Sequence, residues 1–270
     1  MRATTFTLPP LPELRATTVF GTTIRYYDVG GGPTLVLIHG IGGDADDWAF
    51  CLDALSRSHR VIALDLLGFG RSAKPHIDYT IAGYVEVLAR FLNTLALQRP
   101  ILVGHSLGGW IAATLALQSP QAVDKLVLVD SAGVWGEMST LPVDLHVSTL
   151  AHMREIFQFL FYDKRLATDS LVELAYSQHL ERNDGYTIHS ILQNTSDGRE
   201  RLDADQRLSA LSVPTLILWG ENDEMIPLAI GRRIHQLVPG STLAVIPQCG
   251  HLPNLEKPAE LVRCLLEFLG

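Results

Sequence analysis

Ser106 is the residue whose type and surroundings point most directly to covalent chemistry. It lies in the segment GHSLGG at 104–109, between an apolar run of strand type at 100–103 and an apolar helical pattern at 110–117. A serine on such a sharp strand-to-helix turn has a strained backbone and an exposed hydroxyl, and the flanking glycines let neighbouring segments approach closely. The segment predicts a nucleophilic serine, with a glycine-rich turn that only packs as the alternative.

A serine hydroxyl becomes a good nucleophile when a base removes its proton and a third group orients that base. His251 follows the last predicted strand, at 242–246, and lies on a loop from which it can reach Ser106. Asp223 lies on the turn after the strand at 214–219, where its carboxylate can accept the Nδ1 proton of the histidine. The order serine, acid, histidine along the chain is the order expected for this topology.

Three other carboxylates compete with Asp223 for the role of the acid. Glu221 and Glu224 are of the right type and lie on the same turn. Asp130 has the right location, directly after the strand at 125–129, although it could instead support the hinge of the segment that follows. We predict Asp223 as the acid and keep these three as alternatives.

Attack on a carbonyl group creates an oxyanion, which fixed N–H donors stabilise by about 3 kcal/mol per donor. The amide of Leu107 begins the helix after Ser106, where the helix dipole also favours negative charge. The amide of Ile41 lies in the turn HGIGG at 39–43, after a central strand. These two amides form the predicted oxyanion hole, and His39 is expected to brace its loop.

Other residues near these groups have less specific interpretations. Trp48, Trp110 and Leu252 are candidates for the wall of the substrate pocket, and core filling is an equally good interpretation for the two tryptophans. His105 and Glu256 are expected to make structural contacts.

The elements that position these residues alternate between strand and helix patterns. A hairpin of two strands at 16–20 and 23–29 precedes six apolar runs of strand type. This alternation predicts an α/β fold with an open, mostly parallel sheet, helices on both faces and ligands beyond the carboxyl ends of the strands. The six runs lie at 34–38, 60–64, 100–103, 125–129, 214–219 and 242–246.

The segment at 134–208 breaks this alternation, because it has no good strand but several helical patterns, including 150–161 and 170–180. We interpret it as a helical cap domain that is inserted after the sixth strand and shapes the substrate pocket. The core domain is predicted at 1–133 and 209–270, with an extended N-terminal arm at 1–15.

Composition favours a protein that binds a small-molecule substrate. The chain has 270 residues, of which 47% are hydrophobic and 19% charged, and a net charge of −8. Without a basic segment, this acidity argues against a nucleic-acid partner. The N-terminus lacks the apolar core of a secretory signal, and no apolar stretch is long enough to span a bilayer. We therefore expect a cytoplasmic protein with no membrane partner, and make no prediction of its oligomeric state.

No cofactor or metal site is predicted. The three cysteines are too scattered for a disulfide framework and form no C-x-x-C pattern, which fits a reducing compartment. Four histidines of the predicted cap lack the H-E-x-x-H pattern or other ligand spacing. They are His146, His152, His179 and His189.

From about residue 16 to 270 the sequence resembles the α/β-hydrolase superfamily. The resemblance implies an eight-stranded α/β-hydrolase fold, a cap, and a triad of Ser106, His251 and Asp223 that works without metal or cofactor. The matching segments are His39-Gly40 followed by Trp48, DLLGFGRS at 65–72, GHSLGG at 104–109, Trp219-Gly220 with Asp223, and Gly250-His251.

Within that superfamily the chain looks like the branch that contains carboxylesterases and meta-cleavage-product hydrolases, which cut carbon–carbon bonds. The segment at 159–172 is the part most similar to the latter enzymes, but four positions depart from their pattern. Gly42-Gly43-Asp44 replaces Gly-Pro-Gly, His105 replaces asparagine, Ala175 replaces a cap arginine that grips the substrate carboxylate, and Leu252 replaces tryptophan.

The missing arginine decides our choice of function, because a buried dienolate carboxylate without a cationic partner is costly to desolvate. We expect a carboxylesterase for small or medium acyl esters, acting through an acyl-enzyme on Ser106. The alternatives are a carbon–carbon bond hydrolase of the meta-cleavage-product type, a peroxidase-type member of the superfamily and, from a different class, a non-catalytic protein that binds a small ligand.

Overall fold

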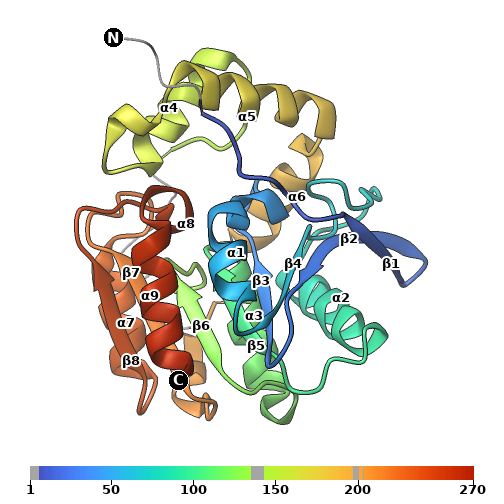
Figure 1. Cartoon of the computed structure of the whole chain (residues 1–270), viewed down its shortest axis with the longest axis vertical. Helices are drawn as coiled ribbons and strands as arrows, with labels where there is room; N and C mark the ends of the chain where they lie inside the picture. The colour runs from blue at the N-terminus through green and yellow to red at the C-terminus, as the bar shows by residue number, and fades with distance from the viewer. Residues whose placement is uncertain (1–5, 135–142, 197–200, 203) are drawn as a thin grey trace.

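An eight-stranded sheet forms the centre of the computed structural model, which describes residues 6–134, 143–196, 201–202 and 204–270 (Figure 1). The strand order is β1-β2-β4-β3-β5-β6-β7-β8; β1 and β2 run antiparallel to their neighbours, and the remaining pairs are parallel. The predicted fold class is therefore confirmed. The strands are β1 Arg15–Val19, β2 Thr22–Val29, β3 Thr34–Ile38, β4 Arg60–Leu64, β5 Ile101–His105, β6 Leu126–Val129, β7 Thr215–Gly220 and β8 Thr242–Ile246.

The central strands are buried on both sides, as their continuous apolar runs predict. Every residue of β5, β6 and β7 is buried. The predicted strand at 100–103 ends two residues early, because Gly104 and His105 continue the ladder opposite Leu128 and Val129 of β6. The strand therefore runs up to the residue before Ser106.

Helices cover both faces of the sheet (Figure 1). One face packs against α2, α3 and α7, and the other packs against α1 and α9. The two apolar clusters on these faces bury the strands between them. The bounds of these helices are α1 Ala49–Ser56, α2 Ile81–Thr94, α3 Leu107–Gln118, α7 Leu228–Leu237 and α9 Pro258–Leu269, with the short α8 Pro253–Glu256 before α9.

Three helices, which we call the cap helices, lie beyond the carboxyl ends of the central strands (Figure 1). They are α4 Leu150–Leu160, α5 Asp169–Arg182 and α6 Gly185–Thr195, and the first two match the predicted helices at 150–161 and 170–180. The division into a core domain and a cap domain stays a prediction, and residues 135–142, 197–200 and 203 of the predicted cap lie outside the described residues. Short 3-10 turns occur at Ala45–Trp48, Pro120–Ala122, Lys164–Leu166 and Ala204–Ala210.

None of the helices in the described ranges is both long and apolar enough to cross a membrane.

The N-terminal segment runs from the cap helices to the edge of the sheet (Figure 1). The amide of Phe6 donates a hydrogen bond of 2.7 Å to Ser170 Oγ on α5, and the Phe6 ring packs edge-on against Phe50 of α1. The predicted arm at 1–15 is one residue too long, because Arg15 already pairs with Tyr26 in the sheet. Residues 1–5 of that arm lie outside the described residues.

Gly108 lets α3 approach β3 more closely than any other residue type allows. A Cβ atom at this position would overlap the backbone carbonyl oxygens of Ile38 and His39. Backbone atoms cannot move aside as a flexible side chain can, so a larger residue must displace the helix that begins after Ser106.

We expect Gly108→Ala to lower the free energy of unfolding by about 1–3 kcal/mol, the usual cost of overpacking. The matched control is Gly185→Ala at the start of α6, where an added Cβ meets no atom within 4 Å. There a change of at most about 1 kcal/mol, in the stabilising direction, is expected from lower chain entropy of the unfolded state. Urea unfolding measures both variants, and equal effects would contradict the close approach.

Candidate active site

Ser106 lies between β5 and α3 with a backbone conformation that L-residues rarely adopt, at φ 51° and ψ −117°. Its amide donates to the carbonyl of Val129 (2.9 Å), and its carbonyl accepts from the amides of Gly109 (3.0 Å) and Ala132 (3.0 Å). A residue outside the favoured backbone regions costs about 1–3 kcal/mol and persists only where its surroundings hold it. These hydrogen bonds to the next strand and its loop supply that constraint.

The structure brings Ser106, His251 and Asp223 into one hydrogen-bonded series. His251 Nε2 lies 3.1 Å from Ser106 Oγ, and His251 Nδ1 lies 2.7 Å from Asp223 Oδ2. The other oxygen of Asp223 accepts from the amides of Met225 (2.8 Å) and Ile226 (2.9 Å), which orient the carboxylate. Because Nδ1–H donates to Asp223, Nε2 carries the lone pair and can accept the serine proton.

Asp130 lies beside this series but does not contact the imidazole through a hydrogen bond. Its Oδ1 accepts from the Gly220 amide at 2.8 Å, and the side chain is fully buried. Burial, reinforced by the charge of Asp223, raises the pKa of Asp130 well above its usual value. The geometry therefore assigns the hydrogen bond of the imidazole to Asp223, while Asp130 binds the Gly220 amide beside the pair.

The two glutamates that compete by type are engaged elsewhere. Glu221 accepts a 3.3 Å hydrogen bond from the amide of Gln248, and Glu224 pairs with Lys164 at 3.1 Å. Neither hydrogen bond involves the imidazole of His251.

Asp130, Asp223 and His251 are also the one group of potential metal ligands found among the described residues, with ligand atoms within 4.8 Å of one another. The 2.7 Å hydrogen bond between Asp223 and His251 Nδ1 uses the atoms that a metal would need. This donor set fits a proton-transfer series better than a metal centre.

The two predicted oxyanion donors face the same cavity as Ser106. Ile41 and Leu107 both line it, and within the part of the chain that the structure describes no hydrogen bond uses either amide. Leu107 is the first residue of α3, so its N–H has no partner in the helix. Both amides are thus available to an oxyanion.

His39 connects the loop of Ile41 to the loop after β4. Its Nδ1–H donates to Gly40 O (2.7 Å), and its Nε2 accepts from the Leu66 amide (2.9 Å). Burial lowers the pKa of His39 to about 4, so the ring is neutral at neutral pH. A neutral ring with one donor and one acceptor satisfies both contacts.

The loop of His251 is held by contacts that the sequence patterns did not reveal. The His251 amide donates to Leu160 O at the end of α4 (2.7 Å), and Glu256 accepts from the amides of Gly250 (2.7 Å) and Asp163 (2.7 Å). A Cβ at Gly250 would overlap Leu160 O, so glycine is required for this approach. Glu256 therefore links the histidine loop to the end of a cap helix rather than only to its own loop.

A cavity of about 250 Å³ lies between Ser106 and the cap helices. Its wall is mainly apolar, and Phe6 and Leu8 of the N-terminal segment contribute to it, which sequence periodicity could not show. The apolar side chains from the cap helices are Met153, Ile156, Phe157, Leu160, Leu171, Leu174, Ala175, Ile188, Ile191 and Leu192.

Two of the three predicted pocket-lining residues lie in this wall, Trp110 and Leu252. The prediction for Trp48 was wrong. Its side chain is fully buried in the apolar cluster on the α1 and α9 face of the sheet, so it fills the core instead.

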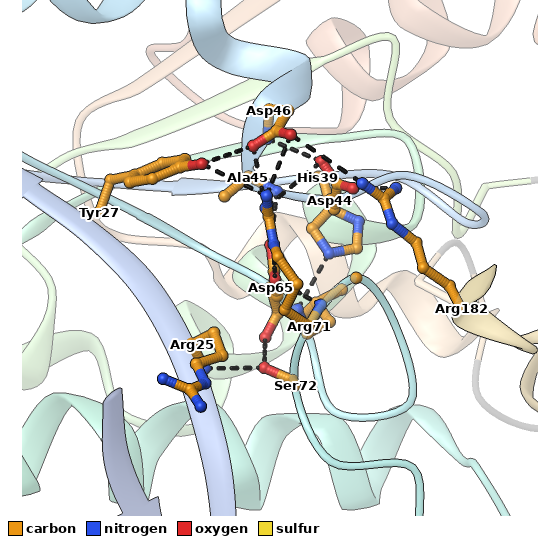
Figure 2. A network of polar contacts seen from close by, with 12 residues as sticks. Arg25, Tyr27, His39, Asp44, Ala45, Asp46, Asp65, Arg71, Ser72 and Arg182 are labelled. Carbon is orange, nitrogen blue, oxygen red and sulfur yellow. Dashed lines mark hydrogen bonds and ion pairs between the residues drawn. The ribbon is translucent and has the colours of Figure 1, made fainter. Parts of the chain in front are cut away.

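A polar network at one end of the cavity braces the loop of Ile41 (Figure 2). Arg71 donates to Asp65 Oδ2 (3.0 Å) and to Asp46 Oδ1 (2.9 Å), and Asp65 Oδ1 accepts from the Ala45 amide (2.8 Å). Burial opposes ionisation of Asp65, but the hydrogen bonds from Arg71 outweigh it and lower its pKa. The predicted pattern at 65–72 thus supplies a buried ion-pair network, not a catalytic group.

His105 is a buried neutral histidine that supports the loop of His251. Its Nε2–H donates to His251 O (2.7 Å), and burial lowers its pKa to about 3. Its burial can therefore be tested through the pH dependence of stability. Above pH 6.5 both the folded and unfolded states hold a neutral ring. Below pH 6.5 only the unfolded state binds the proton, so the free energy of unfolding falls as the pH drops. The contribution lost between pH 8 and pH 5 is about 2 kcal/mol.

We expect His105→Gln to remove this pH dependence while an amide keeps the hydrogen bond to His251 O. The measurement is the difference in unfolding free energy between wild type and variant, from urea titrations at pH 5, 6, 7 and 8. A difference that does not change with pH would contradict a buried neutral His105.

Comparisons with known proteins identify relatives of the chain in sequence and in structure. The sequence is 34% identical over 261 residues to a 2-hydroxy-6-oxo-2,4-heptadienoate hydrolase of Pseudomonas putida F1, covering 93% of this chain and 94% of that one. The structure is similar to a meta-cleavage product hydrolase (CumD) of Pseudomonas fluorescens IP01, with a TM-score of 0.85, 27% identity and coverage of 94% and 97%. It is also similar to a membrane phospholipase A, with a TM-score of 0.79, 27% identity and coverage of 95% and 85%.

A family model described as alpha/beta hydrolase fold matches residues 33–258, which include Ser106, Asp223 and His251. The match extends from the start of the parallel sheet to the beginning of the last helix. The chain is thus a hydrolase that belongs to the alpha/beta hydrolase fold family.

Proposed function

We propose that this hydrolase cleaves carboxylic esters with small to medium acyl groups through an acyl-enzyme on Ser106. The observation that carries the proposal is the hydrogen-bonded series of Ser106, His251 and Asp223 at the floor of a mainly apolar cavity. A strained serine, a base oriented by a buried carboxylate and two unused amides are the parts that acyl transfer needs.

The reaction begins when His251 Nε2 takes the proton of Ser106 as Oγ attacks the ester carbonyl carbon. Asp223 stabilises the imidazolium, and the amides of Ile41 and Leu107 donate to the oxyanion. The tetrahedral intermediate collapses as the imidazolium gives its proton to the leaving alkoxide. His251 then takes a proton from a water molecule as its oxygen attacks the acyl carbonyl carbon. The second tetrahedral intermediate collapses as the imidazolium returns this proton to Ser106 Oγ, which releases the acid and free Ser106.

The wall of the cavity supports an uncharged acyl group. Ala175 on α5 lines the cavity at the position where the resemblance to carbon–carbon hydrolases would place a substrate-binding arginine. A carboxylate buried against Ala175 would lose its hydration without gaining a cation. Binding of an aliphatic acyl chain is favourable instead, by about 25 cal/mol for each Å² of apolar surface removed from water.

Carbon–carbon bond hydrolysis is the second candidate function. It is favoured by the 34% identity to the heptadienoate hydrolase of Pseudomonas putida F1 and by the similarity to CumD. The same serine series and oxyanion donors would serve it, so the two functions differ in the group that the cavity binds.

Replacement of the nucleophile provides the first test. We expect Ser106→Ala to lower kcat for p-nitrophenyl butyrate by more than about 1000-fold and to abolish labelling by a fluorophosphonate, because no acyl-enzyme can form. The matched control is Ser131→Ala, another buried serine, whose Oγ donates a hydrogen bond to Ala132 O and to no other residue that the structure describes. Circular dichroism checks that both variants fold.

Residual turnover in Ser106→Ala near that of Ser131→Ala would refute the mechanism. Labelling of Ser106 in the wild type without any ester turnover would favour the non-catalytic ligand-binding alternative.

The bond that is cleaved is tested by direct competition between substrates. A series of p-nitrophenyl esters with two to ten acyl carbons is compared with a ring-fission dienolate, whose colour disappears on cleavage. We expect the highest kcat/KM for an ester, with a maximum at intermediate chain length set by the cavity. A kcat/KM for the dienolate above that of every ester would replace esterase by carbon–carbon hydrolase.

A further inference from the structure

Arg182 brings a positive charge into the wall of the substrate cavity. It is the last residue of α5, and its side chain is 15% exposed. Figure 2 shows its guanidinium beside Asp44, in the loop that follows Ile41. Among the described residues that line the cavity, it is the single arginine or lysine.

The charge of Arg182 is already balanced by the protein. Its guanidinium forms an ion pair with Oδ2 of Asp44, whose side chain is only 2% exposed. Its next anionic neighbour, Asp46 Oδ2, is 3.9 Å away, and that carboxylate is held by Arg71 (2.9 Å). Asp44 is therefore the nearest anion to Arg182, and its other carboxylate oxygen, Oδ1, lies 3.8 Å from Arg71.

Asp44 is ionised under the conditions in which an esterase is assayed. Burial raises the pKa of its carboxyl to about 6, against the opposing effect of the Arg182 charge. At pH 8 the carboxylate form therefore predominates. Carboxyl groups outnumber cations in this wall, since Asp46, Asp47 and Asp184 line it as well.

A substrate carboxylate that approached Arg182 would have to share its guanidinium with Asp44. Two carboxylates around one buried guanidinium leave a negative charge without a partner, and such a charge is expensive in a poorly hydrated site. An uncharged substrate meets a pair that is already neutral. The ion pair thus repels a second anion although an arginine is present.

We propose that the ion pair between Asp44 and Arg182 determines the charge selectivity of the site: it restricts the enzyme to substrates without a carboxylate, and loss of the Asp44 charge would convert Arg182 into a carboxylate-binding residue. This inference rests on the proposed ester hydrolysis and adds the charge of the substrate to it.

Asp44→Asn isolates that charge with little change in shape. Asp44 Oδ1 caps the following 3-10 turn by accepting from the Asp46 amide at 2.7 Å, and an asparagine Oδ1 keeps this hydrogen bond. Arg182→Gln removes the cation in a second variant. Asp53→Asn is the matched control, because Asp53 is 85% exposed on α1 and, among the described residues, forms an ion pair with Arg57 alone.

The experiment compares kcat/KM at pH 8 for two pairs of esters that differ by one carboxylate. The first pair, p-nitrophenyl hexanoate and mono-p-nitrophenyl adipate, varies the acyl half. The second pair, phenyl hexanoate and 4-carboxyphenyl hexanoate, varies the alcohol half. The same preference is measured as the ratio of dissociation constants for monoethyl and diethyl adipate in the Ser106→Ala background, which requires no turnover.

We expect the wild type and Asp53→Asn to prefer the neutral ester of both pairs by about tenfold or more. Asp44→Asn is expected to reduce that preference by about tenfold in kcat/KM for at least one pair of esters, because Arg182 can then bind the carboxylate. The ratio of the dissociation constants for monoethyl and diethyl adipate is expected to fall by the same factor. The double variant Asp44→Asn, Arg182→Gln is expected to regain it.

An unchanged preference in Asp44→Asn, or a double variant that behaves like Asp44→Asn alone, would overturn the proposal. If the wild type cleaves none of the four esters, the proposed function fails, and the dissociation constants still decide the charge selectivity.

Discussion

The strained backbone of Ser106 is the constraint on which the site depends. A residue at φ 51° is stable here because β6 and its loop hold both its amide and its carbonyl, and because α3 can begin directly behind it. Gly108 lets α3 lie close to β3, because it leaves room for the carbonyl oxygens of Ile38 and His39. The strain aims the hydroxyl away from the sheet, toward the imidazole and the two free amides.

His251, the base in this series, is positioned by contacts with the cap helices. The amide of His251 donates to the carbonyl of Leu160, the last residue of α4, and Glu256 joins the same loop to the turn that follows. Because the histidine loop and the cap helix share these hydrogen bonds, a shift of α4 also shifts the base. The position of α4, which lines the cavity, is thus coupled to the distance between His251 and Ser106.

Buried charge near the oxyanion donors stabilises the loop and also limits what the cavity can bind. Arg71 is shared by Asp65 and Asp46, while Arg182 of α5 is paired with Asp44 (Figure 2). Removal of one member of such a pair is costly because the other charge stays behind. Because these aspartates balance both arginines, no unbalanced cation remains for a substrate anion, which links the packing of the loop to the choice of substrate.

Local patterns in the sequence determined the class of fold, the strand-to-helix turn at Ser106 and the order of serine, acid and histidine. The reason is that buried strands require continuous apolar runs and a sharp turn requires glycines. These patterns favoured Asp223 but left Asp130 as an alternative, since both follow strand ends and only the path of each loop decides which carboxylate meets the imidazole. Trp48 was placed in the pocket wall by its nearness in sequence, whereas the 3-10 turn before α1 carries it into the apolar cluster on the α1 and α9 face of the sheet. The contacts of Glu256, Phe6 and Arg182 join segments far apart in the chain, and such contacts exist only once tertiary packing has brought those segments together.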